Sequence, residues 1–355
     1  MRSEITINLS KLDANVKAIR SRLDPGVKIM AVVKDEAYGH GILPIAKHLS
    51  EQVEWFCVAR LQEGIALRES GIKIPILVFE IPEETHGKIY KEYNLTASIA
   101  DLSTFEILEK GTEYHINFDT GMRRLGISPE EYDEAYNKFK EFDKLICTGL
   151  YTHFATADEP SSKSVEIQLS RFKKISSKFP TSLMRHTANT GAIFYYQDLN
   201  LQFDAVRPGV CLYGYLAGSS ESSDLDPIIE WKSHVMQVRK VREGESVSYG
   251  EAWVAPKDGY VGTIPIGYSD GIQRLLSGKF QVEINGEFVQ QVGRISMDYF
   301  GVFSERSSFV KGDEVSIFNG ANLNPKVWAN VLNTIPYEIT TSLAKRIERK
   351  YLNKQ

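Results

Sequence analysis

The sequence has little of what would place it in several common classes of protein. Its 355 residues include only three cysteines, Cys57, Cys147 and Cys211. They are odd in number and far apart, so we expect buried free thiols in a reducing compartment rather than disulfides or a metal site. The 42 basic and 46 acidic residues give a formal net charge of −4 without a basic tract. Neither a nucleic acid nor an anionic membrane is therefore indicated as a partner.

Signals for location and for common ligands are also missing. No apolar run reaches the about 18 residues that a membrane-spanning helix needs. The polar start, Met1 to Ile5, is not a secretory signal, so we expect a cytoplasmic protein. No Walker loop or GxGxxG motif indicates a nucleotide, and no HExxH motif or clustered histidine and carboxylate spacing indicates a metal. With 42% hydrophobic and 25% charged residues, the composition is that of a globular protein of enzyme size.

One lysine ends an apolar run in a way that suggests chemistry. The run Ile29–Val33 has the length and β-branched content of a buried strand, and it stops at Lys34 before the loop Tyr38–Gly41. Burial of an amine at such a strand end would lower its pKa and free it to attack a carbonyl. This is what a Schiff base with an aldehyde such as pyridoxal phosphate requires. An ordinary solvated lysine is the alternative.

The first 215 or so residues alternate between strand-like and helix-like segments. Eight runs predict strands, namely Val27–Val33, Trp55–Val58, Ile74–Phe79, Leu95–Ile99, His115–Phe118, Leu145–Tyr151, Ser182–Met184 and Phe203–Val206. Helices are expected between them, and a first helix is expected to begin at Ser10, with Asp13 at the capping-box position. This alternation predicts an α/β fold with right-handed crossovers, and eight strands favour a (β/α)8 TIM-type barrel. An open doubly wound sheet remains possible.

The pattern changes after the small, polar stretch Ala217–Asp224, which is typical of a linker. Six later runs predict strands joined by short turns, namely Trp231–Val241, Gly259–Pro265, Phe280–Ile284, Glu287–Val292, Tyr299–Phe303 and Glu314–Phe318. Asn285-Gly286 is a hairpin signal between two of them. Helices are expected over 325–333 and 341–351. We therefore predict a smaller, mainly antiparallel β domain over 226–355, after a barrel over 11–225.

In a barrel of this kind, reactive groups gather at the carboxyl ends of the strands. The polar segments that follow the expected strands are Lys34, Asp119–Arg124, Thr152–Phe154, His186–Gly191 and Val206–Gly209. We expect them to face one mouth, although each alone is more often an ordinary structural group. Asn189 and Thr190 open a helix whose free N–H groups suit a phosphate, and Gly209 permits close backbone approach.

Seven motifs, in order, resemble those of the alanine racemase family of pyridoxal phosphate enzymes. They are AVVKDEAYGHG at 31–41, DTGMRRLG at 119–126, GLYTHFATADE at 149–159, VRPGVCLYG at 206–214, VSYG at 247–250, GTIPIGYSDG at 262–271 and VGRISMD at 292–298. The resemblance runs from Ile7 to Glu338. It implies a barrel followed by a β domain that residues 1–10 join as a strand, and a head-to-tail homodimer with shared active sites.

The resemblance also implies roles for individual residues. Lys34 would hold the cofactor and act on the D-face of the substrate, while Tyr249 from the other subunit would act on the L-face, because one base cannot serve both faces. The cofactor would be held by Tyr38, His153, Asn189, Thr190, Arg207, the backbone at Gly209 and Val210, and Tyr337. The substrate would meet Arg124, the backbone at Met297, and Tyr268, which with Tyr337 narrows the entrance.

Two family contacts bear on the electronics of the site. The tyrosine matching Tyr249 contacts the histidine matching His153, which contacts the arginine matching Arg207, and this positive chain would help to ionise the phenol. Arg207 would also face the pyridine nitrogen. Because an arginine cannot give up a proton, the ring would stay unprotonated and be a weaker electron sink, which would limit side reactions.

Three positions depart from the family pattern. Asp35-Glu36 replaces the usual Ala-Asn or Ala-Asp, and Thr190 replaces a serine but keeps the hydroxyl. Asn117 stands where many members carry a carbamylated lysine that orients the arginine matching Arg124. Asn117 cannot be carbamylated, so a bound anion or another contact would have to orient Arg124.

The resemblance implies interconversion of L- and D-alanine, supplying D-alanine for peptidoglycan. A racemase of serine or of broader specificity is the first alternative, although serine-preferring relatives often carry asparagine where Tyr337 stands. A barrel decarboxylase would need a cysteine near the substrate from the second domain, and the sequence has none there. A pyridoxal phosphate carrier would need neither a second domain nor Tyr249.

Overall fold

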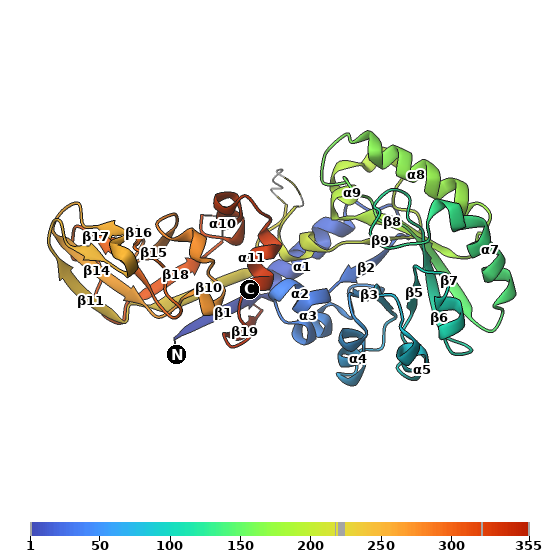
Figure 1. Ribbon diagram of the computed structural model, residues 1–355, viewed down its shortest axis with the longest axis horizontal. Helices are drawn as coiled ribbons and strands as arrows, with labels where there is room; N and C mark the ends of the chain where they lie inside the picture. Colours follow the sequence, from blue (N-terminus) through green and yellow to red (C-terminus); the bar gives the residue numbers. More distant parts are fainter. Residues whose placement is uncertain (1, 217, 219–223, 321, 354–355) are drawn as a thin grey trace.

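The computed structural model describes residues 2–216, 218, 224–320 and 322–353, and most of the expected linker over 217–224 lies outside them. The chain forms a barrel and a separate sheet domain, which lie side by side along the long axis (Figure 1). Helices α10 (Pro325–Leu332) and α11 (Pro336–Ser342) belong to the later part of the chain but lie on the barrel side of the sheet domain.

Eight parallel strands form the barrel, in the order β4-β3-β2-β9-β8-β7-β6-β5. The two edge strands, β4 and β5, are joined by a parallel bridge between Leu77 and Thr96, so the sheet closes. The strands are β2 (Lys28–Val32), β3 (Trp55–Val58), β4 (Ile76–Val78), β5 (Ala97–Ile99), β6 (Glu113–Asn117), β7 (Ile146–Tyr151), β8 (Met184–Asn189) and β9 (Ala205–Arg207). The predicted barrel is confirmed, and the doubly wound alternative is wrong.

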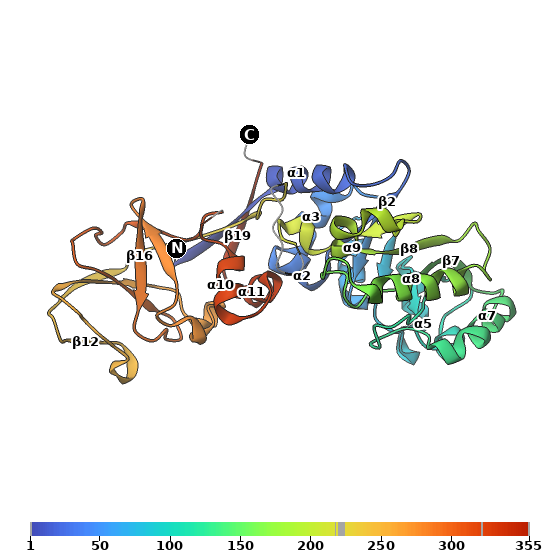
Figure 2. The same ribbon diagram turned by 90° about the horizontal axis from the view of Figure 1, so that it is seen from above.

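Helices surround the barrel because their apolar faces must cover the outer side of the strands. Seen from above, α1 runs along one side of the barrel and α7 and α8 along the other (Figure 2). The barrel helices are α1 (Leu9–Arg20), α3 (Ile42–Leu49), α4 (Leu61–Glu69), α5 (Gly87–Glu92), α6 (Thr104–Ile107), α7 (Tyr132–Glu141), α8 (Lys163–Ser176) and α9 (Thr190–Tyr195). Helix α1 is capped by Asn8, whose side chain accepts the Lys11 N–H, rather than by the expected Ser10.

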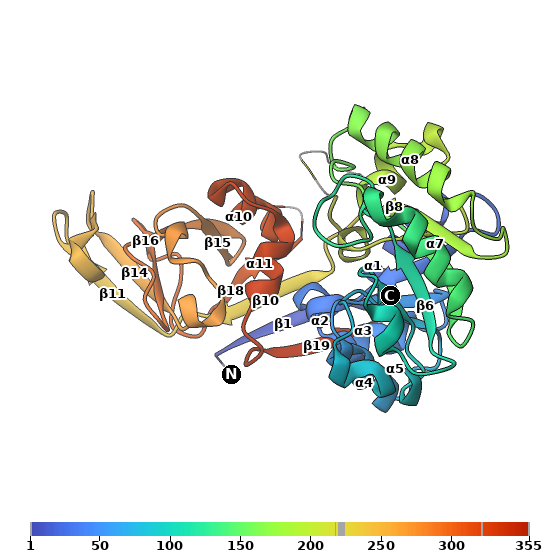
Figure 3. The ribbon, with the colours of Figure 1, turned by 45° about the vertical axis from the view of Figure 1, so that its right-hand side comes forward.

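The sheet domain is built on nine strands in the order β11-β14-β17-β16-β15-β18-β10-β1-β19. These are β1 (Ser3–Asn8), β10 (Ile229–His234), β11 (Gln237–Val241), β14 (Gly259–Ile264), β15 (Gln281–Ile284), β16 (Glu287–Val292), β17 (Phe300–Ser304), β18 (Glu314–Phe318) and β19 (Glu348–Leu352). All neighbouring pairs are antiparallel except β1 with β19. Strand β1 therefore joins a sheet whose other strands all follow residue 228, and Figure 3 shows β1, β10 and β19 side by side at the junction with the barrel.

Four sequence expectations need correction beyond single-residue shifts of boundaries. The expected helix over 341–351 is wrong, since α11 ends at Ser342 and β19 follows. The run 231–241 is two strands, because Val235 and Met236 interrupt it. The seventh barrel strand begins at Met184 and continues to Asn189, so His186 lies inside the barrel wall rather than beyond it. Cys211 lies in a 3-10 turn rather than in a strand.

The backbone directly after Lys34 is unusual. Asp35, Glu36, Ala37 and Tyr38 all have positive φ, between +51° and +57°, and form a short left-handed helical turn, α2 (Lys34–Gly39). L-residues in this conformation cost about 1–2 kcal/mol each. Gly39 continues the turn with φ +87°, and a Cβ there would lie 2.0 Å from the carbonyl oxygen of Thr340. The rest of the molecule must therefore hold this turn in place.

Candidate active site

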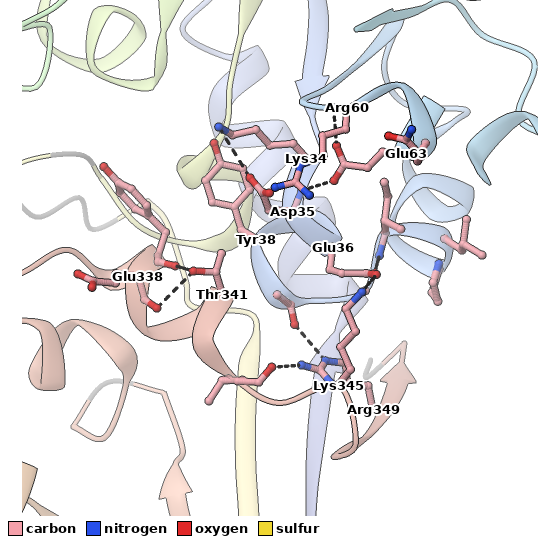
Figure 4. Close-up of a pocket in the computed structure, with 18 of the residues that line it drawn as sticks. Lys34, Asp35, Glu36, Tyr38, Arg60, Glu63, Glu338, Thr341, Lys345 and Arg349 are labelled. Carbon is pink, nitrogen blue, oxygen red and sulfur yellow. Dashed lines mark hydrogen bonds and ion pairs between the residues drawn. The ribbon is translucent and has the colours of Figure 1, made fainter. Parts of the chain in front are cut away.

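Lys34 stands at the mouth of the barrel, where β2 ends and the left-handed turn begins. Its side chain is 37% exposed, and its Nζ lies 3.9 Å from Oδ2 of Asp35 (Figure 4). The sequence suggested a desolvated amine. In the single chain this is wrong, because the amine is neither fully buried nor far from a carboxylate. Asp35 is itself fixed, since its N–H donates to Glu63 Oε1 at 2.5 Å.

A cavity of about 1170 Å³ adjoins Lys34 and separates the barrel from α11. Figure 4 shows Lys34 and Tyr38 side by side and pointing the same way, with Glu338 and Thr341 of α11 opposite them. The walls come from the turn after β2, from α3 and α4, and from the segment between Ile335 and Tyr351. A cavity of this size beside the candidate lysine could hold a ligand of moderate size.

Positive charges converge on His153 from three other strand ends. Burial, followed by the positive charges of Arg207, Arg124 and Lys34, lowers the pKa of the His153 imidazole to about 3. All three cations stand at or just after the carboxyl ends of barrel strands, which places them at the same mouth as His153. His153 is neutral at pH 7 and therefore adds no charge to this cluster. The three cations at the mouth would favour an anionic ligand.

Arg207 is 3% exposed and anchored by four hydrogen bonds. It donates to Nδ1 of His186 at 2.6 Å, to the carbonyl oxygen of His186 at 2.7 Å, and to those of Thr152 at 2.6 Å and Thr187 at 3.2 Å. Among the described residues its partners do not include His153, whose ring makes no hydrogen bond there. The expected contact between His153 and Arg207 is therefore absent from the single chain, although the two side chains are close.

A small cradle lies beside the end of β2, where the Val32 N–H donates to the carbonyl oxygen of Pro208 at 2.9 Å. Gly209 N–H donates to Thr190 Oγ1 at 3.1 Å, and a Cβ on Gly209 would lie 2.7 Å from the Tyr38 hydroxyl. That hydroxyl has no hydrogen-bond partner among the described residues, and burial raises the pKa of Tyr38. Asn189 caps α9 by accepting the Ala192 N–H at 3.1 Å. Val210 follows Gly209 and opens a 3-10 turn.

This cradle fits a phosphate. It combines an unpaired phenol, the start of a short helix, a hydroxyl, and a glycine that leaves room where a side chain would collide. With Arg207 and Lys34 at the same mouth, the residues present match the charged and polar ends of pyridoxal phosphate. The structure brings Tyr38, Asn189, Thr190, Arg207, Gly209 and Val210 together in one chain, as the sequence analysis expected.

Tyr337 reaches the same region from the sheet side. It is the second residue of α11, and its ring meets the ring of Tyr38 edge-on, with centroids 6.0 Å apart. Tyr38 also lies against Tyr213, with centroids 5.0 Å apart. Helix α11 therefore supplies one aromatic wall of the mouth within the same chain.

Arg124 is exposed, on the loop after β6, and makes no hydrogen bond with any described residue. Asn117, at the end of β6, donates to the carbonyl oxygen of Leu125 at 3.2 Å. It therefore holds the backbone beside Arg124 and not the guanidinium group. Asp119 supports the same loop by accepting the N–H groups of Gly121 and Arg123 at 2.9 and 3.0 Å.

Three expected site residues are not at this mouth. Tyr249, Met297 and Tyr268 are 68%, 54% and 42% exposed, and all lie in the sheet domain. Tyr249 lies in the turn between the two short strands β12 (Ser246–Val247) and β13 (Trp253–Val254), and Figure 2 shows β12 at the end of the domain farthest from the barrel. A single chain therefore does not bring Tyr249 to Lys34.

Sequence reasoning missed a buried column behind Arg207. His115 Nδ1 and His186 Nε2 are 2.8 Å apart, and His186 is stacked on Tyr151 with ring centroids 4.9 Å apart. Burial, followed by the charge of Arg207, lowers the pKa of His115 to about 3. His115 and Arg207 are too far apart in sequence for their spacing to show this. The available signal was a histidine in each of β6 and β8, two barrel strands that are separated only by β7.

Among the described residues, no group of three or more histidine, cysteine, aspartate or glutamate side chains could hold a metal ion. Within the same residues, no helix is long and apolar enough to cross a membrane.

Comparison with known proteins assigns both parts of the chain. Residues 7–217 match the alanine racemase N-terminal domain, and residues 228–351 match the alanine racemase C-terminal domain. The alanine racemase of Treponema denticola is 35% identical over 371 residues, covering 98% of this chain and 97% of that protein.

Solved structures agree with these matches. Alanine racemase of Clostridium difficile 630 superposes with a TM-score of 0.91 at 31% identity, covering 99% of this chain and 96% of that one. Alanine racemase of Bartonella henselae with covalently bound pyridoxal phosphate gives a TM-score of 0.91 at 29% identity, covering 99% and 100%. With a lysine at a barrel mouth, a cradle that fits a phosphate beside it and full-length matches to both domains, this chain belongs to the alanine racemase family.

Proposed function

We propose that this protein is an isomerase that uses pyridoxal phosphate to interconvert L-alanine and D-alanine. The observation that carries the proposal is the barrel mouth, where Lys34, Arg124, His153 and Arg207 lie at strand ends and the cradle of Thr190 and Gly209 adjoins the end of β2. Full-length similarity to alanine racemases supports the same reaction, and a relative from Bartonella henselae carries the cofactor covalently bound. When bound, pyridoxal phosphate supplies an electron-accepting ring that stabilises the negative charge left on the substrate α-carbon.

The residues of the mouth divide the work of holding the cofactor. Lys34 offers its Nζ to the aldehyde, while Tyr38, Thr190 and the backbone at Gly209 and Val210 suit the phosphate. Asn189 fixes the start of α9 that Thr190 opens. Arg207 would face the ring nitrogen, and its four existing hydrogen bonds hold it rigidly there. Because Arg207 cannot release a proton, that nitrogen would remain unprotonated.

Racemisation needs a base on each face of the α-carbon. We assign the D-face to Lys34, whose Nζ removes or returns the proton there. We assign the L-face to Tyr249 of the partner subunit, whose phenol oxygen does the same from the opposite side. The exposure of Tyr249 in the single chain and its distance from the barrel support a partner subunit as the source, in a head-to-tail homodimer.

The substrate carboxylate requires a cation that is not already paired. Arg124 meets this requirement among the described residues, and Asn117 holds the loop that carries it. The backbone at Met297 and the ring of Tyr268, both from the partner subunit, would complete the pocket. Tyr337 would narrow it and favour a small side chain.

His153 takes a different part from the one that the sequence suggested. Since burial makes it neutral, it can receive a hydrogen bond from Tyr249 of the partner subunit but lends no charge to it. The positive character that would favour an ionised phenol comes from Arg207, Arg124 and Lys34.

We further propose a division of the chain into a strand over 1–10, a barrel over 11–225 and a β domain over 226–355. We propose a cytoplasmic location and a role in supplying D-alanine for peptidoglycan.

Deuterium exchange at the α-carbon tests the reaction and its specificity together. Purified protein with pyridoxal phosphate would be incubated in deuterated water with L- and D-alanine and with L- and D-serine. We expect both alanine isomers to exchange and interconvert faster than serine. Equal or faster exchange of serine would favour the broader racemase, and loss of carbon dioxide would indicate a decarboxylase. The absence of any exchange would rule out racemisation.

A further inference from the structure

The left-handed turn Asp35–Tyr38 connects two residues of the proposed site, Lys34 and Tyr38. Four successive L-residues with φ between +51° and +57° form a strained backbone that does not persist by itself. Three backbone hydrogen bonds lie within the turn or at its edge. They run from Ala37 N–H to the carbonyl oxygen of Val33, from His40 N–H to that of Ala37 and from Gly41 N–H to that of Glu36, at 2.9, 3.2 and 2.7 Å. Additional contacts are needed to select this conformation.

Three side chains from the segment after α11 supply such contacts, and we call Lys345, Arg349 and Tyr351 the C-terminal clamp. Arg349 Nε donates to the carbonyl oxygen of Gly39 at 3.0 Å, and the Tyr351 hydroxyl donates to that of His40 at 2.9 Å. Lys345 Nζ lies 2.6 Å from Glu36 Oε1, as Figure 4 shows. The clamp therefore contacts the turn at its beginning and twice at its end.

Arg349 is the central member of the clamp. Besides Gly39 it donates to the carbonyl oxygens of Ala344, Ile347 and Leu343, at 3.2, 3.1 and 3.2 Å. One planar guanidinium group thus ties the backbone of its own segment to the backbone of the turn. A lysine has a single donor centre and could not make these bonds together.

The turn and α11 also touch without any intervening side chain. A Cβ on Gly39 would lie 2.0 Å from the carbonyl oxygen of Thr340, so the two backbones are in contact. Glu36, where the family pattern predicts a shorter asparagine or aspartate, is long enough to accept both the Ile42 N–H at 3.3 Å and the Lys345 amine. Because exposed ion pairs contribute little, Lys345 assists the clamp while Arg349 and Tyr351 carry it.

We propose that Arg349 and Tyr351, assisted by Lys345, are positioning residues that hold the left-handed turn and thereby fix where Lys34 and Tyr38 point. The clamp belongs to the sheet domain, because β19 pairs with β1 in the nine-stranded sheet. The sheet domain thus supports the lysine of its own chain, separately from any residue it gives to a partner. The effect on the cofactor rests on the proposed function, whereas the effect on the turn does not.

Hydrogen exchange tests the clamp without the cofactor. In the full chain free of cofactor, Arg349→Met should speed amide exchange of residues 34–42 by on the order of tenfold, because the turn opens more often. Tyr351→Phe removes a single hydroxyl and should give a smaller change in the same peptide. Lys350→Met is the matched control. It removes a charge from the same strand, but Lys350 pairs with Glu4 of β1 and not with the turn.

The cofactor-loaded protein gives the second readout. For Arg349→Met and Tyr351→Phe, we expect weaker circular dichroism of the visible band of the lysine-bound cofactor and faster cofactor release. Lys350→Met should match the unchanged protein in both.

The proposal is overturned if Arg349→Met and Tyr351→Phe behave like Lys350→Met in exchange. It is also overturned if exchange rises while the visible band and cofactor release stay unchanged, since the turn would then not position Lys34. Should Arg349→Met fail to fold, Tyr351→Phe decides by the same measurements. Absence of a visible band in the unchanged protein would instead contradict the proposed function. Hydrogen exchange alone would then test whether the clamp holds the turn.

Discussion

The barrel and the sheet domain hold their site residues in opposite ways. On the barrel, Arg207 and Thr190 are 3% and 5% exposed and are fixed by hydrogen bonds within the chain. On the sheet domain, Tyr249 and Met297 are 68% and 54% exposed, and Tyr249 lies far from the barrel mouth. Arg207 and Thr190, which are proposed to hold the cofactor, are therefore buried within one chain, whereas Tyr249 and Met297, which are proposed to face the substrate, are open to solvent.

This difference shows where rigidity is needed. A ring nitrogen and a phosphate need fixed partners, and fixed partners are most easily built inside one folded unit. The second base only has to approach an accessible face, and it can come from another subunit. The comparison between the two halves leads to five predictions, given from the largest expected effect to the smallest.

Removing the lysine should disable the barrel half altogether. Lys34→Ala deletes both the anchor for the cofactor and the proposed base on the D-face. We expect loss of the visible band and of α-proton exchange from both alanine isomers. Lys28→Ala, an exposed residue at the other end of β2, is the control and should retain both. Retention of the band in Lys34→Ala would show that another amine holds the cofactor.

Changing the tyrosine should impair the sheet half while sparing the barrel half. Tyr249→Phe should keep the visible band but lose about 10²–10⁴-fold in α-proton exchange from L-alanine, with a far smaller loss from D-alanine. Equal losses for both isomers would contradict the assignment of faces.

The same variant tests whether the two halves come from different subunits. Refolding Tyr249→Phe together with Lys34→Ala in equal amounts gives mixed dimers with one intact site each. Half of all dimers are then mixed, and each mixed dimer has one intact site out of two. About a quarter of the unaltered activity should therefore return. If no activity returns although mixed dimers form, both residues must come from the same chain.

Acid should weaken the barrel before the sheet domain. Burial lowers the pKa of His40 to about 4 and of His115 and His153 to about 3, and it holds that of His186 well below its ordinary value. The unfolded chain therefore binds more protons than the folded chain between about pH 6.5 and pH 4, so stability falls as the pH falls through this window. Each histidine contributes at most about 1.4 kcal/mol per pH unit.

The sheet domain provides the internal reference for this titration. Its one histidine is His234. Hydrogen exchange at pH 7 and pH 5 should show loss of protection first in β6 and β8, and later or not at all in β14 and β17. Simultaneous loss in both regions would mean that the two domains unfold as one unit.

The smallest effect concerns packing alone. A Cβ on Gly149 of β7 would lie 2.7 Å from the ring of His115, whereas one on Gly301 of β17 would come no closer than 3.3 Å to its nearest neighbour. Gly149→Ala should lower the free energy of unfolding by about 1–3 kcal/mol. Gly301→Ala should change it less, and denaturant titration of the two variants measures the difference. A larger loss of unfolding free energy for Gly301→Ala would contradict the inference that Gly149 of β7 has less free space around it than Gly301 of β17.

Much of the fold could be predicted because its signals are local. All eight barrel strands were found from short apolar runs, and the hairpin at Asn285-Gly286 joins β15 and β16 as expected. Strand β8 was cut short because it contains Arg185, His186 and Thr187, polar residues that look like a loop by hydrophobicity. The segment 348–352 was taken for a helix because its partner, β1, lies more than 340 positions earlier.

The site shows the same limit. The groups at the strand ends, such as Lys34, Thr190 and Arg207, could be placed at one mouth because parallel strands all end on one side. The left-handed turn could not be foreseen, since Asp35 to Tyr38 are residues that ordinarily avoid positive φ. The partners of Arg207 also differed from expectation, because the choice between His153 and His186 depends on how the side chains pack inside the barrel.

The contact between Arg349 and Gly39 has a consequence for the order of events during synthesis. The two residues are 310 positions apart, and β1 likewise stays without β10 and β19 until those strands emerge from the ribosome. Chains fold largely from the N-terminal side as they are made, and contacts across such distances form late. Nascent chains can therefore close the barrel early, but the turn that bears Lys34 gains its clamp only after residue 349 has been released.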